Sequence, residues 1–264
     1  MNRTVSSQLM LDITEPAELV FAIAVSPAHE VGDERLTARI DGRDLPITEY
    51  TDVHDTRLHR VEAPIGRLAV EYQAAVGAGA PARVTEVDRF TYLRPSRYAE
   101  SDALAATAAA EFGGLDDPAQ LLVAVSSWVG TRLRYLSGSS RPTDGAVSTL
   151  LAREGVCRDF AHLATALLRA RGVAARTVAV YAPGLDPMDF HAVVEADIDG
   201  VWRVVDPTTL APRSALVRIA TGRDAADTAF LNVLSGRATL RDMTVTATAN
   251  SLPADDLDVL TSIA

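Results

Sequence analysis

The chain has 264 residues, of which 48% are hydrophobic, and it carries a formal net charge of −10 at pH 7. This charge argues against a nucleic-acid partner or an anionic membrane surface, because both attract clustered lysine and arginine. The single cysteine cannot form an intramolecular disulfide or a thiolate metal cluster, which suits a reducing compartment. Residues 1–16 reach acidic side chains before any apolar stretch long enough for a signal peptide, so we expect a cytoplasmic protein without a membrane segment.

The first third of the sequence predicts antiparallel strands. Between residues 7 and 87 apolar residues recur at every second position, as in residues 9–13 and 19–25. Turn-forming residues separate such runs, for example at Asp41-Gly42. Residues 89–102 then predict an extended connector that contains proline. We therefore expect a β-rich N-terminal domain over residues 1–98 and a second domain over residues 99–264.

From residue 101 the apolar period changes to that of helices. Residues 101–112 and 117–136 are rich in helix formers, and a short helix is expected over residues 146–153. After a further helix, three strands are expected at residues 176–182, 190–197 and 201–206, the last two joined by a turn at Asp199-Gly200. This order predicts an α+β domain in which helices pack on an antiparallel sheet.

The only cysteine, Cys157, lies in the first turn of a strongly amphipathic predicted helix. The apolar stripe of this helix has the spacing i, i+3, i+4, i+7 and i+8 and consists of Phe160, Leu163, Ala164, Leu167 and Leu168. The positive end of a helix dipole and the unpaired first-turn N–H groups stabilise a thiolate, and the same N–H groups can donate to an oxyanion. The alternative is an ordinary buried residue, because free cysteine is among the most buried residue types.

A nucleophilic cysteine needs a base, and His191 is the best-placed histidine because it opens the second of the three predicted strands. His162 lies five residues after Cys157, about 140° around a helix, so we expect it to be a packing or surface residue. The three N-terminal histidines have polar neighbours in the sequence, and we expect them on a solvated face: His29, His54 and His59.

The register of the last predicted hairpin brings an aspartate to this histidine. A two-residue turn at Asp199-Gly200 pairs residues whose numbers sum to 399, so Asp206 lies opposite Val193. The side chain of Val193 shares a face with that of His191, because side chains alternate along a strand. Asp206 is then the diagonal neighbour of His191, within reach of a hydrogen bond. A slip of one residue would separate the two, and Asp206-Pro207 could also be a plain turn.

Two stretches together resemble the core of a known family. GVCRDFAHLATALLRARGVAARTVAVYAPG (155–184), followed by FHAVVEADIDGVWRVVDPT (190–208), is similar to the transglutaminase-like superfamily, whose prokaryotic members are cysteine enzymes or are inferred to be. In that pattern Gly-x-Cys begins the central helix, a histidine begins the next strand and Asp-Pro-Thr closes the following one. SSWVGTRLRY (126–135) and GRDAADTAFL (222–231) resemble the flanking segments of the bacterial type, and the β-rich N-terminus resembles the domain that precedes its core.

The resemblance implies a papain-like, transglutaminase-like α+β core with Cys157, His191 and Asp206 as a catalytic triad and with no cofactor or metal. His191 takes the proton of Cys157, the thiolate attacks a carboxamide or peptide carbonyl, and Asp206 orients the imidazole. We expect a protease or amidase that acts on a peptide or protein substrate. Amine transfer by a true transglutaminase is one alternative, and a non-catalytic peptide-binding or scaffolding module on the same fold is another. A metallohydrolase is disfavoured because the sequence has no cluster of histidine and carboxylate ligands.

Three further features bear on the expected site. Family members take a second oxyanion donor from upstream of the cysteine, and the candidates are Gln120, Trp128 and Tyr135, with Trp128 favoured as a core residue. Asp159 is expected to cap the start of the helix or to form a salt bridge there. The loop over residues 184–189 precedes His191 and is well placed to line a substrate cleft.

Overall fold

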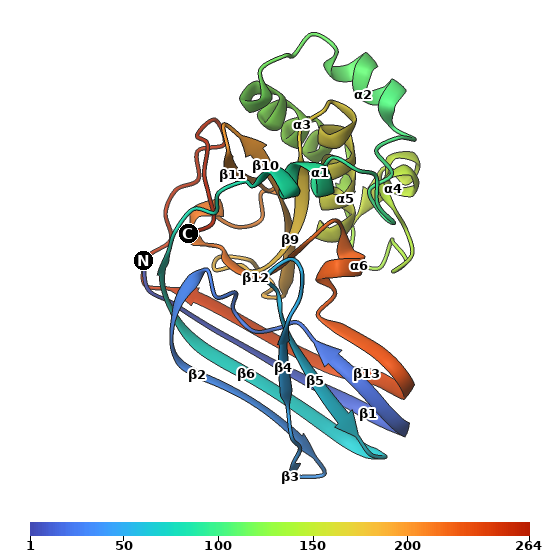
Figure 1. The fold of residues 1–264 in the computed structure, drawn as a ribbon, viewed down its shortest axis with the longest axis vertical. Helices are drawn as coiled ribbons and strands as arrows, with labels where there is room; N and C mark the ends of the chain where they lie inside the picture. The colour runs from blue at the N-terminus through green and yellow to red at the C-terminus, as the bar shows by residue number, and fades with distance from the viewer.

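The computed structural model describes residues 1–264 and shows a sheet-rich part below a helix-rich part (Figure 1). The sheet-rich part is a seven-stranded antiparallel sheet. Its strands are β1 (Arg3–Phe21), β2 (His29–Ile40), β3 (Arg43–Asp44), β4 (Thr48–Thr51), β5 (Arg57–Ala63), β6 (Gly66–Gly79) and β13 (Leu231–Ala249).

Strand β1 organises this sheet, because it is long enough to pair with three other strands. Every second side chain between Val5 and Ile13 is buried, as the alternation in the sequence predicts. β6 and β5 lie end to end along one side of β1, with Ile13 opposite Gly66 and Ala17 opposite Ala63. β13 runs along the other side of β1 from Arg3 to Phe21. The sequence-based boundary at residues 98 and 99 is therefore wrong for residues 231–249, which return to the N-terminal sheet.

The helix-rich part packs helices on a second, four-stranded antiparallel sheet in the order β11-β10-β9-β12. These strands are β9 (Ala175–Tyr181), β10 (Phe190–Ile198), β11 (Val201–Val205) and β12 (Val217–Gly222). The helices are α1 (Glu86–Tyr92), α2 (Ala105–Phe112), α3 (Pro118–Arg132), α4 (Ala146–Ala152), α5 (Cys157–Ala170) and α6 (Ala225–Thr228), with a 3₁₀ turn at Arg213–Ala215. A two-stranded parallel pair, β7 (Arg134–Tyr135) and β8 (Glu154–Gly155), completes the fold.

Helix α5 is the centre of the helix-rich part. It lies against β10 and β9, and α2, α3 and α4 surround its remaining faces. All five residues of the predicted apolar stripe are buried, in a core that includes Leu122 of α3 and Val194 of β10. The chain is therefore an α+β protein with helices on an antiparallel sheet, preceded by a β-rich N-terminal part.

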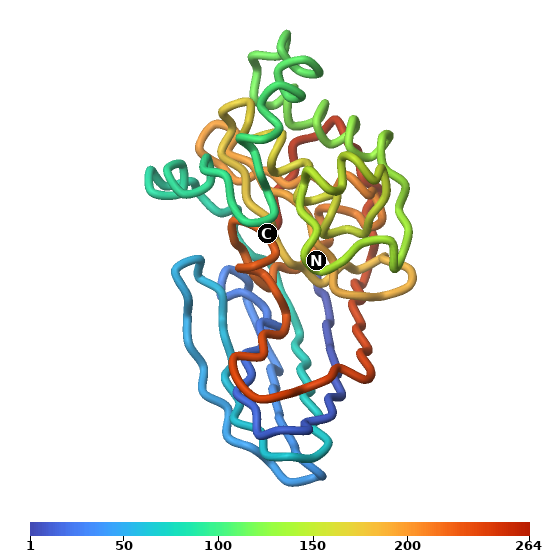
Figure 2. Tube along the Cα trace, turned by 90° about the vertical axis from the view of Figure 1, so that its right-hand side faces the viewer, coloured from blue at the N-terminus to red at the C-terminus, as the bar shows by residue number.

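The two parts share a continuous apolar core. Tyr181 of β9 and Val217 and Ile219 of β12 belong to the same buried cluster as the inward side chains of β1. The hydroxyl of Tyr181 donates to the carbonyl of Ile23 at 2.8 Å. Both chain termini lie close to the junction between the two parts in two perpendicular views (Figures 1 and 2). This shared core gives the second sheet a fixed position over the first.

The connector between the two parts is partly helical, although the sequence predicts an extended segment there. Helix α1 begins after Thr85, whose hydroxyl oxygen accepts from the N–H of Asp88 at 3.1 Å. The carboxylate of Asp88 in turn accepts from the N–H of Thr85 at 2.8 Å. This reciprocal capping satisfies two backbone donors and supports a helix of only seven residues.

No helix has the length and apolar character needed to cross a membrane.

Candidate active site

Cys157 occupies the first position of α5, and its first turn is held by a buried carboxylate. The carboxylate of Asp159 is fully buried and accepts from the N–H of Val156 at 2.8 Å, so Asp159 caps the helix as the sequence predicts. Gly155 makes room for it, because a Cβ at that position would stand 2.6 Å from the Cβ of Asp159. Cys157 itself is only partly buried.

The predicted hairpin register is confirmed. Val194 pairs with Val205 and Ile198 with Val201, around a turn in which Asp199 and Gly200 both have positive φ. The Nε2 atom of His191 lies 2.7 Å from the Oδ2 atom of Asp206, and both side chains are almost completely buried. His191 and Asp206 are thus diagonal neighbours at the open end of the hairpin and form a hydrogen bond, as expected from side-chain alternation.

The environment of His191 favours its protonated form. Burial lowers its pKa, but the charge and the hydrogen bond of Asp206 outweigh burial, with a smaller contribution from Cys157, and raise the pKa to about 10. Burial conversely raises the pKa of Asp206, and the charge of His191 reverses this effect and lowers it. The pair is therefore an imidazolium and a carboxylate at neutral pH. Because Cys157 contributes to the pKa of His191, the structure places the thiol within interaction range of the imidazole.

Thr208 holds the other oxygen of the carboxylate. The Oδ1 atom of Asp206 accepts from the hydroxyl of Thr208 at 2.7 Å and from its N–H at 2.9 Å. Asp206 thus has one oxygen for His191 and one for Thr208, so its carboxylate cannot rotate without losing hydrogen bonds. The sequence prediction did not include Thr208 in the site. The Asp-Pro-Thr motif was the available signal, because threonine two residues after aspartate commonly closes such a turn.

Tyr135 is the one upstream donor candidate that lies beside Cys157. Strand β7 pairs with β8 so that Tyr135 stands opposite Gly155, two residues before the cysteine. Burial raises the pKa of Tyr135 to about 12, and the charge of Cys157 adds to this effect. Tyr135 therefore keeps its phenolic proton at neutral pH and can donate a hydrogen bond close to the sulfur.

The other two candidates lie elsewhere. The indole N–H of Trp128 donates to Glu111 at 2.8 Å, and its ring packs edge-on against Phe112. Gln120 stands near the start of α3, in a second hollow that Tyr135 does not line. Tyr135 lies in β7, which pairs with the segment just before α5, so of the three candidates it is the one at the first turn of α5.

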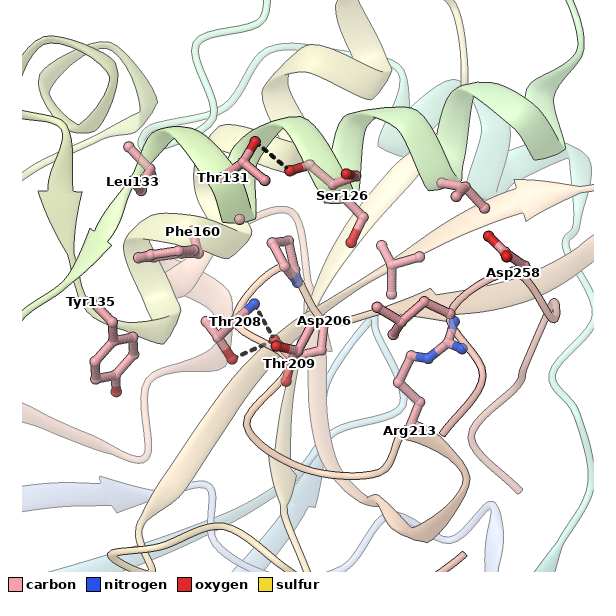
Figure 3. A pocket seen from close by; sticks show the side chains of 16 residues that line it. Ser126, Thr131, Leu133, Tyr135, Phe160, Asp206, Thr208, Thr209, Arg213 and Asp258 are labelled. Atoms are coloured by element: carbon pink, nitrogen blue, oxygen red, sulfur yellow. Dashed lines mark hydrogen bonds between the residues drawn. The ribbon is translucent and has the colours of Figure 1, made fainter. Parts of the chain in front are cut away.

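A pocket of about 450 Å³ opens beside Asp206, between α3 and the segment that follows β11 (Figure 3). Tyr135 and Phe160 stand at one end of it, Asp206 and Thr208 line its middle, and Asp258 lies at the other end. The loop over residues 184–189 does not line this pocket. Its last residue, Asp189, is nevertheless close to the site, because the charge of His191 acts on its pKa, which burial raises.

The remaining histidines serve the packing of the fold. His162 is fully buried, and its Nε2 atom accepts from the N–H of Ala225 at 3.0 Å, so it is a packing residue as expected. The expectation of a solvated face is wrong for His29 and His59, which are buried, whereas His54 is partly buried. His29 accepts from the N–H of Arg218 at 3.0 Å, His59 lies 3.1 Å from Glu49, and His54 lies 2.8 Å from the hydroxyl of Tyr92.

Comparison with known proteins agrees with this geometry. The family model "Transglutaminase-like superfamily" matches residues 106–207, which contain Cys157, His191 and Asp206. A crystal structure described as that of "a Putative Cysteine Protease from Cytophaga hutchinsonii" is 32% identical in sequence, with a TM-score of 0.87 over 98% of this chain and 96% of that chain. The shared fold thus includes the N-terminal sheet as well as the helix-rich part.

Two mycobacterial relatives are also similar. An uncharacterised protein of Mycobacterium leprae is 30% identical over 162 residues, which are 57% of this chain and 58% of the relative. An uncharacterised protein of Mycobacterium tuberculosis is 36% identical over 135 residues, which are 51% of this chain and 42% of the relative. The matches span about half the length of these curated relatives. Together with the matching family model and the full-length structural neighbour, they show that the chain belongs to the transglutaminase-like superfamily.

Proposed function

We propose that this protein is a cysteine hydrolase that cleaves peptide or amide bonds with Cys157 as the nucleophile. The observation that carries this proposal is the buried pair of His191 and Asp206, joined at 2.7 Å and charged at neutral pH, beside a partly buried cysteine at a helix N-terminus. The similarity to the Cytophaga hutchinsonii structure supports the same reaction class, because the likeness covers nearly the whole of both chains.

The geometry suggests a role for each group. Nε2 of His191 is engaged by Asp206, which leaves Nδ1 as the ring nitrogen that exchanges a proton with the thiol. The thiolate of Cys157 attacks the carbonyl carbon, a C–S bond forms, and the oxyanion accepts from the N–H of Cys157 and the hydroxyl of Tyr135. The C–N bond then breaks as the imidazolium gives its proton to the leaving amine.

Water completes the cycle. His191 takes a proton from a water molecule whose oxygen attacks the acyl carbon, the C–S bond breaks, and the thiolate returns. We favour water over an amine as the acceptor because Cys157 is only partly buried, whereas amine transfer requires a site that excludes water.

The decisive experiment measures turnover of a fluorogenic peptide library by the wild type and by Cys157→Ala, in parallel with a glutamine peptide and a labelled primary amine. We expect hydrolysis that disappears in Cys157→Ala. Amine incorporation faster than hydrolysis would make the protein a transglutaminase. Peptide binding without any thiol-dependent turnover would instead indicate a non-catalytic module.

A further inference from the structure

The pocket beside Asp206 is one half of a longer groove that follows helix α3. A second hollow of about 520 Å³ lies along the same helix and reaches back to Ala119 and Gln120. The two hollows share three lining residues, Val123, Ser127 and Asp258, so they are continuous. One wall of the groove is α3. The opposite wall is the segment after β11 together with the C-terminal segment at residues 257–260.

The C-terminal wall is firmly attached to the body of the protein. The guanidinium of Arg213 is buried and donates to each of the two carboxylate oxygens of Asp255 at 3.0 Å. It also donates to the carbonyl of Val259 at 3.3 Å. The N–H of Val204 on the edge strand β11 donates to the carbonyl of Thr261 at 2.8 Å. Buried and edge-strand hydrogen bonds therefore hold this wall of the groove against the fold.

The size of the groove suits an extended peptide. From Gln120 to Thr131 helix α3 advances by roughly 16 Å at about 1.5 Å per residue. An extended chain advances by about 3.3 Å per residue, so roughly five residues span this length. The groove ends at Tyr135 and Phe160. Tyr135 pairs with Gly155, two residues before Cys157, and Phe160 lies three residues after Cys157 on α5, so this end of the groove is next to the first turn of that helix.

The chemistry of the lining favours a particular kind of chain. Hydroxyl groups of Ser127, Thr131 and Thr209 offer hydrogen bonds, and Val123 and Leu257 offer apolar contact. The one basic residue in the lining, Arg213, is occupied by Asp255. Asp258 has no cationic partner, and it lines the part of the groove that both hollows share. The groove thus presents one free negative charge at a distance from the thiol.

We propose that this groove binds an extended segment of about five residues on one side of the scissile bond, with a lysine or arginine of that segment beside Asp258. The proposal rests on the function proposed above, because it assigns the groove to the substrate of Cys157. It narrows the substrate class to peptides or unfolded protein segments that carry a basic residue a few positions from the cleaved bond.

Binding is measured in the Cys157→Ala background, so that the test does not depend on turnover. Fluorescein-labelled hexapeptides that carry lysine, alanine or glutamate at one scanned position are titrated with the protein at low salt and followed by anisotropy. We expect lysine to bind about 3- to 10-fold more tightly than glutamate at one position, as for an exposed charge pair. Asp258→Lys should reverse this preference. Asp242→Lys on the exposed strand β13 changes the net charge by the same amount and should leave the preference for lysine unchanged.

A second variant tests the groove itself. Ser127 is exposed and lines both hollows, so Ser127→Trp should fill the groove and weaken hexapeptide binding at least 10-fold. Ala110→Trp on the exposed face of α2 is the matched control. In the wild-type background Ser127→Trp should not change the rate at which iodoacetamide alkylates Cys157, which shows that the triad is intact.

Hexapeptides that bind Ser127→Trp as well as they bind its parent, or a lysine preference that survives Asp258→Lys, would overturn the proposal. A complete absence of peptide binding would overturn it as well. Failure of the proposed function is a separate result, namely a wild type without Cys157-dependent turnover, and the binding measurements remain decisive for the groove in that case.

Discussion

His191 and Asp206 stand 15 residues apart in the chain, and their side chains meet at 2.7 Å inside the protein. The charge of Asp206 raises the pKa of His191 to about 10, so the imidazole is protonated at neutral pH.

Asp206→Asn should lower kcat/KM by about 10³- to 10⁴-fold, because loss of the orienting carboxylate has an effect of this order in a triad. The variant also removes the charge that raises the pKa of His191. We expect iodoacetamide to alkylate Cys157 more slowly in Asp206→Asn than in the wild type at neutral pH, because the variant lacks the charge that keeps His191 protonated. Equal alkylation rates in the two proteins would show that the pair does not activate the thiol.

Thr208→Val should reduce kcat by about 10-fold and leave KM little changed. The variant loses the hydroxyl that donates to Asp206 at 2.7 Å but keeps the N–H donor at 2.9 Å, so the carboxylate is less firmly oriented. Thr208→Ser keeps the hydroxyl and should restore most of the activity. If Thr208→Ser is as slow as Thr208→Val, the methyl group rather than the hydrogen bond is responsible.

Tyr135→Phe should lower kcat by about 10²-fold at constant KM, the usual effect of removing one oxyanion donor. Tyr135 is half-exposed, and its substitution should leave the melting temperature unchanged. Trp128→Phe removes the indole donor that faces Glu111 and serves as a control, because that donor lies away from Cys157. Full activity of Tyr135→Phe would show that backbone N–H groups alone stabilise the oxyanion.

Gly130→Ala should displace the loop that carries Asp206 and Thr208. A Cβ at Gly130 would stand 2.4 Å from the carbonyl oxygen of Pro207, between Asp206 and Thr208, so α3 and this loop must move apart. We expect a loss of about 1–3 kcal/mol in the free energy of unfolding, together with reduced kcat, measured by urea titration and peptide hydrolysis. Gly114→Ala meets no atom within 4 Å and should show neither effect.

Glu195 supports the sheet that carries His191. It is completely buried and accepts from Arg218 at 2.6 Å and from Arg176 at 2.9 Å. Burial raises its pKa, but the two guanidinium groups outweigh this and lower it to about 2. Glu195→Gln leaves two buried cations with no counter-charge and should destabilise the fold by about 3–5 kcal/mol in urea unfolding. Glu62→Gln removes a carboxylate from an exposed pair and should cost less than about 1 kcal/mol.

The carboxylate of Glu195 also predicts that the folded protein loses stability in acid. The pKa of Glu195 is lower in the folded state, so its contribution is complete above about pH 4.3, the value for an unfolded chain, and is lost as the pH falls toward 2. The wild type should therefore lose stability over this range more steeply than Glu195→Gln. Parallel curves for the two proteins would contradict the assignment.

The sequence by itself determined the elements whose signal is local. The apolar stripe of α5 placed Cys157 at a helix start, and the turn at Asp199-Gly200 set the register that joins His191 to Asp206. Both follow from periodicity, which depends only on how a helix or a strand exposes its own side chains. Capping is local as well, so the Thr85–Asp88 motif of α1 was a readable signal that the extended prediction overlooked.

Only the tertiary structure decided which distant segments meet. Most side chains of β13 are exposed, and only its last residues alternate, with Val245 and Ala247 buried, so the sequence pattern does not show that the strand pairs with β1 at the opposite end of the chain. Tyr135 reaches Cys157 through the two-residue pair of β7 and β8, which is too short to leave a pattern. The burial of His29 likewise depends on Arg218 in the other part of the molecule. Burial and contact are properties of two surfaces together, and a local sequence pattern describes only one of them.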